Sequence, residues 1–236
     1  MRILDGQSVA FLGDSITQHP VAVSDWMETQ TDGLPPVGTS VVVNRHENRG
    51  WTHQLANRIR LAYPERRIRY RNAGIGGHSS RQMLARFEAD ILAHRPHWLL
   101  LSAGVVEVRR MYQPDRAQDC VPLDEYAANL TLMTTKALRF NVNVILLEPT
   151  PHLRPVTDGP AEVTLEEVNS LTRQYAKAMA QVAQRLEVGF VPLFEMFLSM
   201  ERRLTGEASL YADEVHLSSL GDLLYSQVVY QYLDFS

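Results

Sequence analysis

Short apolar runs alternate with longer amphipathic segments along most of this 236-residue chain. Five of the apolar runs are predicted strands: Ser8–Leu12, Ile68–Asn72, Trp98–Ala103, Asn143–Glu148 and Gly189–Pro192. The other segments have the periodicity of helices: roughly Trp51–Ala62, Ser80–Ala93, Leu123–Arg139, Leu165–Leu186 and Ser218–Leu233. Because strand–helix alternation covers a parallel sheet on both faces, the sequence predicts an α/β fold, a three-layer α/β/α sandwich with a five-stranded parallel sheet.

No internal repeat, linker or low-complexity tract divides the chain, so residues 1–236 are expected to form a single domain. Two segments interrupt the alternation: Gln18–Asn48 after the first strand and Pro149–Pro160 after the fourth. Long loops in a compact domain are often functional, and both would lie at the carboxyl edge of the sheet. We expect these two segments to form the rim that shapes a substrate site.

Composition and charge argue against several function classes. The formal net charge is −4, and nucleic-acid binding needs clustered cations, so no nucleic-acid partner is expected. No apolar run approaches the length of a membrane span, and the first strand begins too early to leave room for a signal peptide. These features predict a cytoplasmic protein without a membrane partner. The single Cys120 excludes an intramolecular disulfide, and no His/Cys cluster has metal-ligand spacing. Because the candidate nucleophile, base and hydrogen-bond donors described below are all protein groups, neither a metal nor an organic cofactor is expected.

Ser15 stands where the first apolar run ends. Gly13 terminates that run with a residue that tolerates unusual dihedral angles, which places Ser15 on the turn that follows. A side chain on the turn after a parallel strand projects from the carboxyl edge of the sheet, where open α/β sheets bind ligands. The neighbouring Asp14 is expected to organise this turn by accepting hydrogen bonds from nearby backbone.

An acid and a histidine, Asp213 and His216, lie three residues apart near the other end of the chain. A serine hydroxyl is a weak nucleophile that needs a base, and His216 is the candidate because Asp213 could hold one nitrogen of its ring. With Ser15 these residues would form a Ser-His-Asp triad. In the alternative interpretation, Asp213 only caps a helix that begins near Leu217, and His216 is a surface residue.

Three ordered blocks of the sequence resemble the SGNH (GDSL-type) serine esterases. The blocks are Gly13–Thr17 (GDSIT), Asn72–His78 (NAGIGGH) and Asp213–His216 (DEVH). The resemblance implies the flavodoxin-like SGNH hydrolase fold, with Ser15 as nucleophile, His216 as base and Asp213 as the acid that orients it. It also implies an oxyanion hole that contains the backbone N–H groups of Ser15 and Gly77.

Further segments resemble the branch of this family that contains intracellular acetylxylan esterases. These segments are Tyr63–Glu65, Asn72–Ile75, Pro96–Trp98, Val121–Tyr126 and Leu146–Pro149. Enzymes of that branch remove acetyl groups from xylo-oligosaccharides, and they often form homo-oligomers. The resemblance therefore implies an acetyl ester of a carbohydrate as the substrate, and it allows a homo-oligomer.

A further block of the family, which lies between the second and the last of those matched above, departs from its pattern in this chain. The family has Gly-x-Asn-Asp after the third strand, and the asparagine amide donates a hydrogen bond to the oxyanion. The matching residues here are Gly104–Glu107 (GVVE). Val106 replaces the asparagine and cannot donate a hydrogen bond. Loss of one such donor costs about 3–4 kcal/mol of transition-state stabilisation, or roughly 100- to 1000-fold in rate. In the alternative interpretation, Val106 extends the apolar strand end in a relative whose catalysis is slow or lost.

The roles of three nearby side chains stay open. Arg109 or His78 could supply the missing donor, because both side chains carry N–H groups. Glu107 could be a substitute acid, a structural partner of Arg109 or Arg110, or a bystander.

Two functions follow from these residues. The first is a serine esterase that hydrolyses a small acyl ester, namely the acetyl ester of a carbohydrate. The retained Ser15, Asp213 and His216 favour this function. The second is a binding or regulatory protein that keeps the pocket without efficient turnover, and Val106 favours that alternative.

Overall fold

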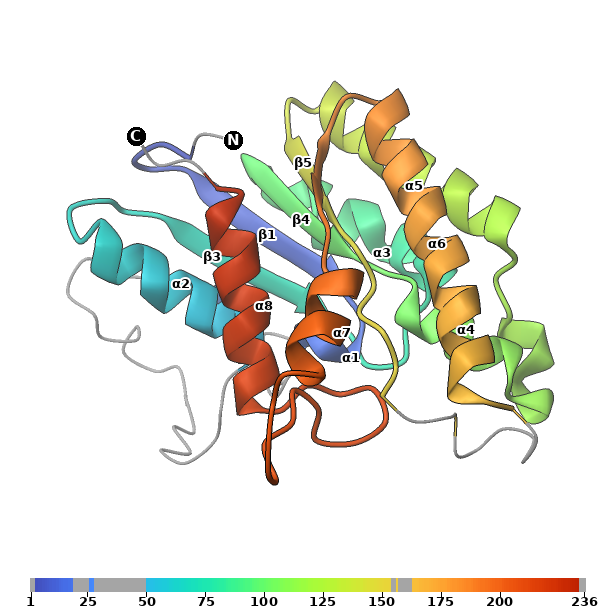
Figure 1. Ribbon diagram of the computed structural model, residues 1–236. Helices are drawn as coiled ribbons and strands as arrows, with labels where there is room; N and C mark the ends of the chain where they lie inside the picture. The colour runs from blue at the N-terminus through green and yellow to red at the C-terminus, as the bar shows by residue number, and fades with distance from the viewer. Residues whose placement is uncertain (1–2, 19–25, 28–49, 154–155, 157–162, 234–236) are drawn as a thin grey trace.

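In the part of the chain that the structure describes, six strands form one sheet, and helices cover both of its faces (Figure 1). The computed structural model describes residues 3–18, 26–27, 50–153, 156 and 163–233. The strands are β1 (Ser8–Gly13), β2 (Trp26–Met27), β3 (Arg69–Gly74), β4 (Trp98–Ser102), β5 (Asn143–Leu147) and β6 (Gly189–Val191). Their order is β2-β3-β1-β4-β5-β6, and all are parallel except β2, which runs antiparallel to β3. The predicted five-stranded parallel sheet is confirmed, with β2 as an additional edge strand.

The segments expected to form the rim of the site are described only in part. Strand β2 comes from the segment 18–48, of which the structure otherwise describes only Gln18. Of the segment 149–160 it describes residues 149–153 and 156. The remaining residues of both lie outside the described part of the chain, so the predicted rim stays a prediction.

Eight α-helices occur among the described residues. They are α1 (Ser15–Gln18), α2 (Gly50–Ala62), α3 (Ser80–Asp90), α4 (Val105–Met111), α5 (Leu123–Arg139), α6 (Leu165–Arg185), α7 (Phe194–Glu201) and α8 (Ser219–Gln231), with 3-10 turns η1 (Leu92–His94) and η2 (Pro114–Asp119). The five predicted helices correspond to α2, α3, α5, α6 and α8. Helices α1, α4 and α7 were not predicted, because 4, 7 and 8 residues are too few to establish a helical period. Every helix described is too short or too polar to span a lipid bilayer.

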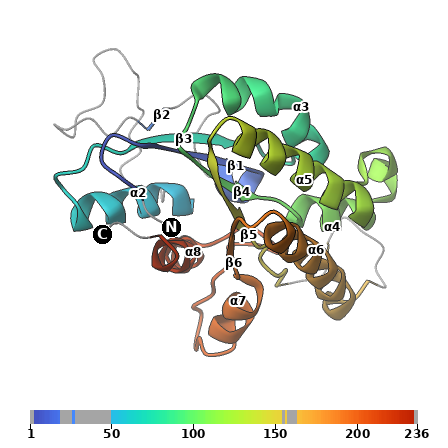
Figure 2. The same ribbon diagram turned by 90° about the horizontal axis from the view of Figure 1, so that it is seen from above.

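The sheet separates two hydrophobic cores. Figure 2 shows α2, α7 and α8 on one face of the sheet and α3, α5 and α6 on the other. Successive residues of β1 alternate between the cores: Val9 and Phe11 pack on the first face, whereas Ala10 and Leu12 pack on the second. Burial on both faces explains why β1 is continuously apolar in the sequence.

The strand order decides where a ligand would bind. Strands β3 and β4 lie on opposite sides of β1, and the connections through α2 and α3 run on opposite faces of the sheet (Figure 2). This reversal is a topological switch point, and parallel α/β sheets bind ligands at the carboxyl ends of the strands that flank it. Ser15 follows β1 and Gly104 follows β4, so both lie at this point of the sheet.

Candidate active site

Ser15 is the first residue of α1, and only Asp14 separates it from the end of β1. The Asp14 carboxylate holds this turn, because its Oδ1 accepts a hydrogen bond from the backbone N–H of Ile16 at 2.9 Å. The predicted role of Asp14 is therefore confirmed. The turn places Ser15 at the carboxyl edge of the sheet.

Asp14 is 1% exposed, and its carboxyl titrates far from the ordinary range. Burial raises the pKa of Asp14 from 3.8 to about 7, and the nearby Glu107 carboxylate also raises it, while the amide of Ile16 and the charge of His216 oppose the change. The turn that carries Ser15 therefore contains a carboxyl that ionises near neutral pH.

We expect Asp14→Asn to stabilise the protein at alkaline pH but not in acid. Between the ordinary pKa of 3.8 and about 7 the folded protein holds the Asp14 proton and the unfolded chain does not, so stability falls as the pH rises through this window. Asparagine keeps the acceptor for Ile16 and never ionises, so its advantage reaches about 4 kcal/mol near pH 8. Thermal unfolding of both proteins between about pH 4 and pH 8 checks this. A stability difference that does not change with pH would contradict the raised pKa.

Close packing between α1 and the end of β3 brings a glycine turn to Ser15. A Cβ on Gly74 would lie 2.4 Å from the backbone N of Gln18, so this contact requires glycine. Gln18 accepts a hydrogen bond through Oε1 from the backbone N–H of Gly76 at 2.5 Å. A Cβ on Gly76 would lie 3.7 Å from Cβ of Ser15. The turn is thereby held next to the serine.

Gly77 is the third residue of this turn. Its φ of +74° lies in the left-handed region that glycine adopts without strain. The N–H of His78 donates to the carbonyl of Ile75 at 3.2 Å and closes the turn. The backbone N–H expected to contribute to an oxyanion hole therefore belongs to a defined turn beside Ser15.

His216 links Ser15 to Asp213. Its Nε2 lies 2.9 Å from Oγ of Ser15, and its Nδ1 lies 2.7 Å from Oδ2 of Asp213. The structure thus brings together the three residues that the sequence proposed as a triad. A proton on Nδ1 that is shared with Asp213 leaves Nε2 as the acceptor for the Ser15 hydroxyl.

Asp213 also fixes the backbone of its own loop. Its Oδ1 accepts hydrogen bonds from the backbone N–H groups of Val215 and His216 at 2.8 Å and 2.7 Å. Burial alone would raise the pKa of the Asp213 carboxyl, but these two amides and the imidazole outweigh it and hold the pKa below the usual value. Asp213 is therefore ionised at neutral pH, as an acid that orients a histidine must be.

The alternative interpretation, in which Asp213 only caps a helix and His216 is a surface residue, is wrong. The residue that caps α8 is Ser218, whose Oγ accepts a hydrogen bond from the N–H of Gly221 at 3.2 Å. The His216 side chain is only 32% exposed and its Nε2 faces Ser15. Asp213 and His216 therefore face the serine turn.

Val106 lies in the first turn of α4. Strand β4 ends at Ser102, so the interpretation of Val106 as an extension of the strand is wrong.

The neighbouring Glu107 is fully buried, and its carboxylate accepts hydrogen bonds from the N–H groups of Ser80 and Gly104. Burial raises the pKa of Glu107. Of the three roles considered for Glu107, the structure supports that of a structural partner. Its partners are backbone amides rather than Arg109 or Arg110, and its carboxylate connects α3 to the start of α4.

Arg109 and His78 have defined partners. Nη2 of Arg109 forms an ion pair with Oε1 of Glu214 at 2.9 Å, which connects α4 to the loop that carries Asp213 and His216. Nδ1 of His78 accepts a hydrogen bond from Nε of Arg86 at 3.2 Å, and burial lowers the pKa of His78. Glu214 was not singled out in the sequence, because a lone acid between Asp213 and His216 carries no periodic or spacing signal.

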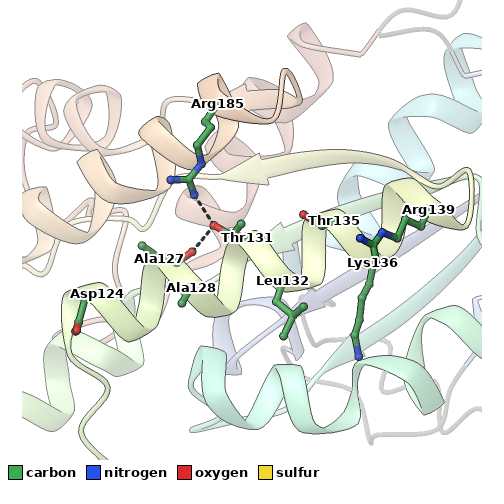
Figure 3. A pocket seen from close by; sticks show the side chains of 9 residues that line it. All are labelled: Asp124, Ala127, Ala128, Thr131, Leu132, Thr135, Lys136, Arg139 and Arg185. Carbon is green, nitrogen blue, oxygen red and sulfur yellow. Dashed lines mark hydrogen bonds between the residues drawn. The ribbon is translucent and has the colours of Figure 1, made fainter.

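A separate hollow of about 590 Å³ lies against α5 (Figure 3). Its lining includes Leu132 and Lys136 of α5 and Arg185 of α6, and none of the predicted site residues. Nη2 of Arg185 donates to Oγ1 of Thr131 at 2.6 Å, which joins the two helices. Within the described part of the chain, no group of three or more His, Cys, Asp or Glu residues is arranged to hold a metal ion.

Comparisons with known proteins find relatives over nearly the whole chain. A family model described as "GDSL-like Lipase/Acylhydrolase family" matches residues 11–223. An acetylxylan esterase from Geobacillus stearothermophilus is 27% identical to this chain over 236 residues, which cover 100% of this chain and 97% of the relative.

Solved structures share the fold. A catalytic mutant of Axe2, an acetylxylan esterase from Geobacillus stearothermophilus, gives a TM-score of 0.81 at 25% identity, with 100% of this chain and 98% of that chain covered. LAE5, an alpha/beta hydrolase enzyme from the metagenome of Lake Arreo, Spain, gives a TM-score of 0.70 at 23% identity, with 98% and 94% covered. At that identity the second likeness shows the fold alone.

Proposed function

Because this chain belongs to the GDSL-like lipase/acylhydrolase family, of the SGNH type, we propose that it removes acetyl groups from a carbohydrate ester by means of Ser15, His216 and Asp213. The resemblance inferred from the sequence is confirmed, and the protein is a carboxylic ester hydrolase. The single observation that carries the more specific proposal is the hydrogen-bond chain from Asp213 through His216 to Ser15.

In the proposed reaction, Oγ of Ser15 attacks the ester carbonyl carbon while Nε2 of His216 takes the hydroxyl proton. The carbonyl electron pair moves to its oxygen, and the N–H groups of Ser15 and Gly77 stabilise the resulting oxyanion. Collapse of this intermediate releases the sugar hydroxyl, which receives the proton from His216. Water then attacks the acetyl-serine with His216 again as base, and acetate leaves.

The relatives support the choice of substrate. The curated relative and the structure with the TM-score of 0.81 are both acetylxylan esterases, and the alignment covers nearly the whole of each. We therefore propose acetylated xylo-oligosaccharides as the substrate class.

Labelling with a fluorophosphonate tests the proposed nucleophile directly. The reagent phosphonylates a serine that a neighbouring base activates, and it tolerates a weakened oxyanion hole. We expect mass spectrometry to locate one adduct on the peptide that contains Ser15, and Ser15→Ala to abolish that adduct. An adduct on another serine, or none, would contradict the proposed triad.

A panel of esters tests the substrate class. We expect acetylated xylo-oligosaccharides and 4-nitrophenyl acetate to be hydrolysed, and 4-nitrophenyl octanoate to react at least about tenfold more slowly than the acetate. Faster hydrolysis of the octanoate would point to a lipid ester. Hydrolysis of 4-nitrophenyl acetate without hydrolysis of any acetylated sugar would contradict the carbohydrate substrate.

Val106 is the observation that favours a second candidate, a binding protein with weakened or absent turnover. That function would follow if Ser15 is not labelled and no ester is hydrolysed while acetylated xylo-oligosaccharides still bind. The single domain, the homo-oligomer, the absence of a nucleic-acid partner and the cytoplasmic location stay predictions.

A further inference from the structure

Helix α4 carries both the altered oxyanion position and an arginine one turn later. Val106 and Arg110 are four residues apart in α4, and residues at this spacing lie on the same face of a helix. The structure therefore places Arg110 one turn after Val106, on the side of α4 that carries the altered position. The Val106 side chain has no hydrogen-bond donor, whereas the Arg110 side chain on the same face of the helix has five N–H donors.

The guanidinium of Arg110 lies against the glycine turn. Its Nη2 is 3.4 Å from the position that a Cβ on Gly77 would occupy. In the same turn, a Cβ on Gly76 would lie 3.7 Å from Cβ of Ser15. Arg110 and Ser15 thus adjoin consecutive residues of one turn, and Gly77 supplies the proposed oxyanion amide.

A neighbouring side chain orients this guanidinium. Nη1 of Arg110 donates a hydrogen bond to Oε1 of Gln113, which is 5% exposed. Gln113 therefore helps to orient the guanidinium, and the Arg110 side chain is itself partly buried. A fixed donor in a partly water-excluded place stabilises a developing charge more than a mobile one does, because it needs no reorganisation.

The two donors considered from the sequence have partners in other directions. Arg109 pairs with Glu214, and His78 accepts from Arg86. Arg110 was considered only as a partner of Glu107, because α4 was not predicted and its spacing from Val106 had no structural meaning without the helix.

We propose that Arg110 is a catalytic residue that donates a hydrogen bond to the oxyanion in place of the asparagine that Val106 replaces. This inference rests on the proposed function. As the Ser15 Oγ–carbon bond forms and the carbonyl electron pair moves to oxygen, an N–H of Arg110 donates a hydrogen bond to that oxygen. The guanidinium keeps its proton, because arginine is not deprotonated in proteins. When the carbon–oxygen bond to the sugar breaks, the oxyanion returns to a carbonyl and the interaction weakens.

A double-mutant cycle tests this role. We expect Arg110→Ala to lower kcat for 4-nitrophenyl acetate about 100-fold with little change in KM, since the interaction belongs to the transition state. In a Val106→Asn background the same Arg110→Ala change should cost less than about fivefold, because the asparagine amide restores a donor to the same oxygen. Thermal unfolding of every variant is measured alongside.

Three further variants sharpen the test. Arg110→Lys keeps the charge without the fork, and we expect it to retain more activity than Arg110→Ala. Added guanidinium ion should raise the rate of Arg110→Ala and leave wild type unchanged, which a merely structural arginine would not produce. The matched control is Arg116→Ala, which removes an arginine paired with Asp119 at 2.6 Å and should leave the rate unchanged.

The outcomes separate this inference from the proposed function. If wild type shows no hydrolysis that depends on Ser15, both fall. If wild type is active and Arg110→Ala matches it, or raises only KM, Arg110 is not an oxyanion donor and the proposed function stands. Equal losses in the Val106 and Val106→Asn backgrounds would also overturn the inference, because they exclude a shared oxygen. If Arg110→Ala unfolds, Arg110→Lys and Arg110→Gln, compared in both backgrounds, decide the same question.

Discussion

Ser15→Ala is expected to lower kcat/KM for 4-nitrophenyl acetate by about 10⁴- to 10⁶-fold, the largest effect of any substitution considered. The hydroxyl is the proposed nucleophile, and its Oγ lies 2.9 Å from the base. Alanine leaves the N–H of residue 15 and that of Gly77 in place, so a small residual rate over water is expected from the oxyanion hole alone. Because only one hydrogen bond is lost, the free energy of unfolding should change by about 1 kcal/mol.

Ser8→Ala is the matched control for this prediction. Oγ of Ser8 lies 3.0 Å from Nδ1 of His97, so the chain contains a second serine–histidine pair. Ser8 is the first residue of β1 and therefore lies at the amino end of the strand, opposite the proposed site. We expect this variant to hydrolyse the acetate like wild type. Comparable activity of Ser15→Ala and wild type would contradict the proposed nucleophile for this substrate.

Asp213→Asn is expected to lower kcat about 10⁴-fold with little effect on stability. Asparagine can keep an oxygen at the position of Oδ1, which accepts from the amides of Val215 and His216. Its NH₂ group then faces Nδ1 of His216 and can only donate, so the imidazole proton must move to Nε2. An imidazole that is protonated at Nε2 donates to Ser15 and cannot accept its proton.

Comparison with Asp213→Ala separates this effect from a loss of loop structure. Alanine removes the acceptor for both backbone amides as well as the partner of the imidazole, so we expect it to lower the unfolding temperature more than asparagine does. Both variants should be similarly impaired in kcat. If Asp213→Asn retains most of the wild-type rate, Asp213 does not set the tautomer of His216, and another acid must do so.

The sheet could be predicted because each strand carries its own signal. Strands β1, β4 and β5 are almost entirely buried on both faces, and such strands appear in a sequence as continuous apolar runs. The long helices α5 and α6 span enough turns to establish a period. Helix α4 has only 7 residues, and its sequence continues the apolar character of β4, so Val106 could not be assigned to a helix from the sequence.

The contacts that decide the candidate site join distant parts of the chain. Arg109 pairs with Glu214 across more than a hundred residues, and the Arg110 guanidinium meets Gly77 from a different element. Neither contact has a local signal, because ion pairs and close approaches depend on which elements the fold brings together. The sequence therefore proposed Arg109 as a donor and gave no reason to consider Arg110 for that role.

By itself, the sequence determined the α/β class, the serine on the turn after the first strand, and the acid three residues before a histidine. These are local properties: apolar burial, glycine at a strand end, and short spacing of polar residues. Only the tertiary structure decided that His216 meets Ser15 across 201 residues, that Glu107 bonds backbone amides, and that Arg110 adjoins the glycine turn. The physical reason is that side-chain geometry at a shared sheet edge depends on the packing of elements that are far apart in the chain.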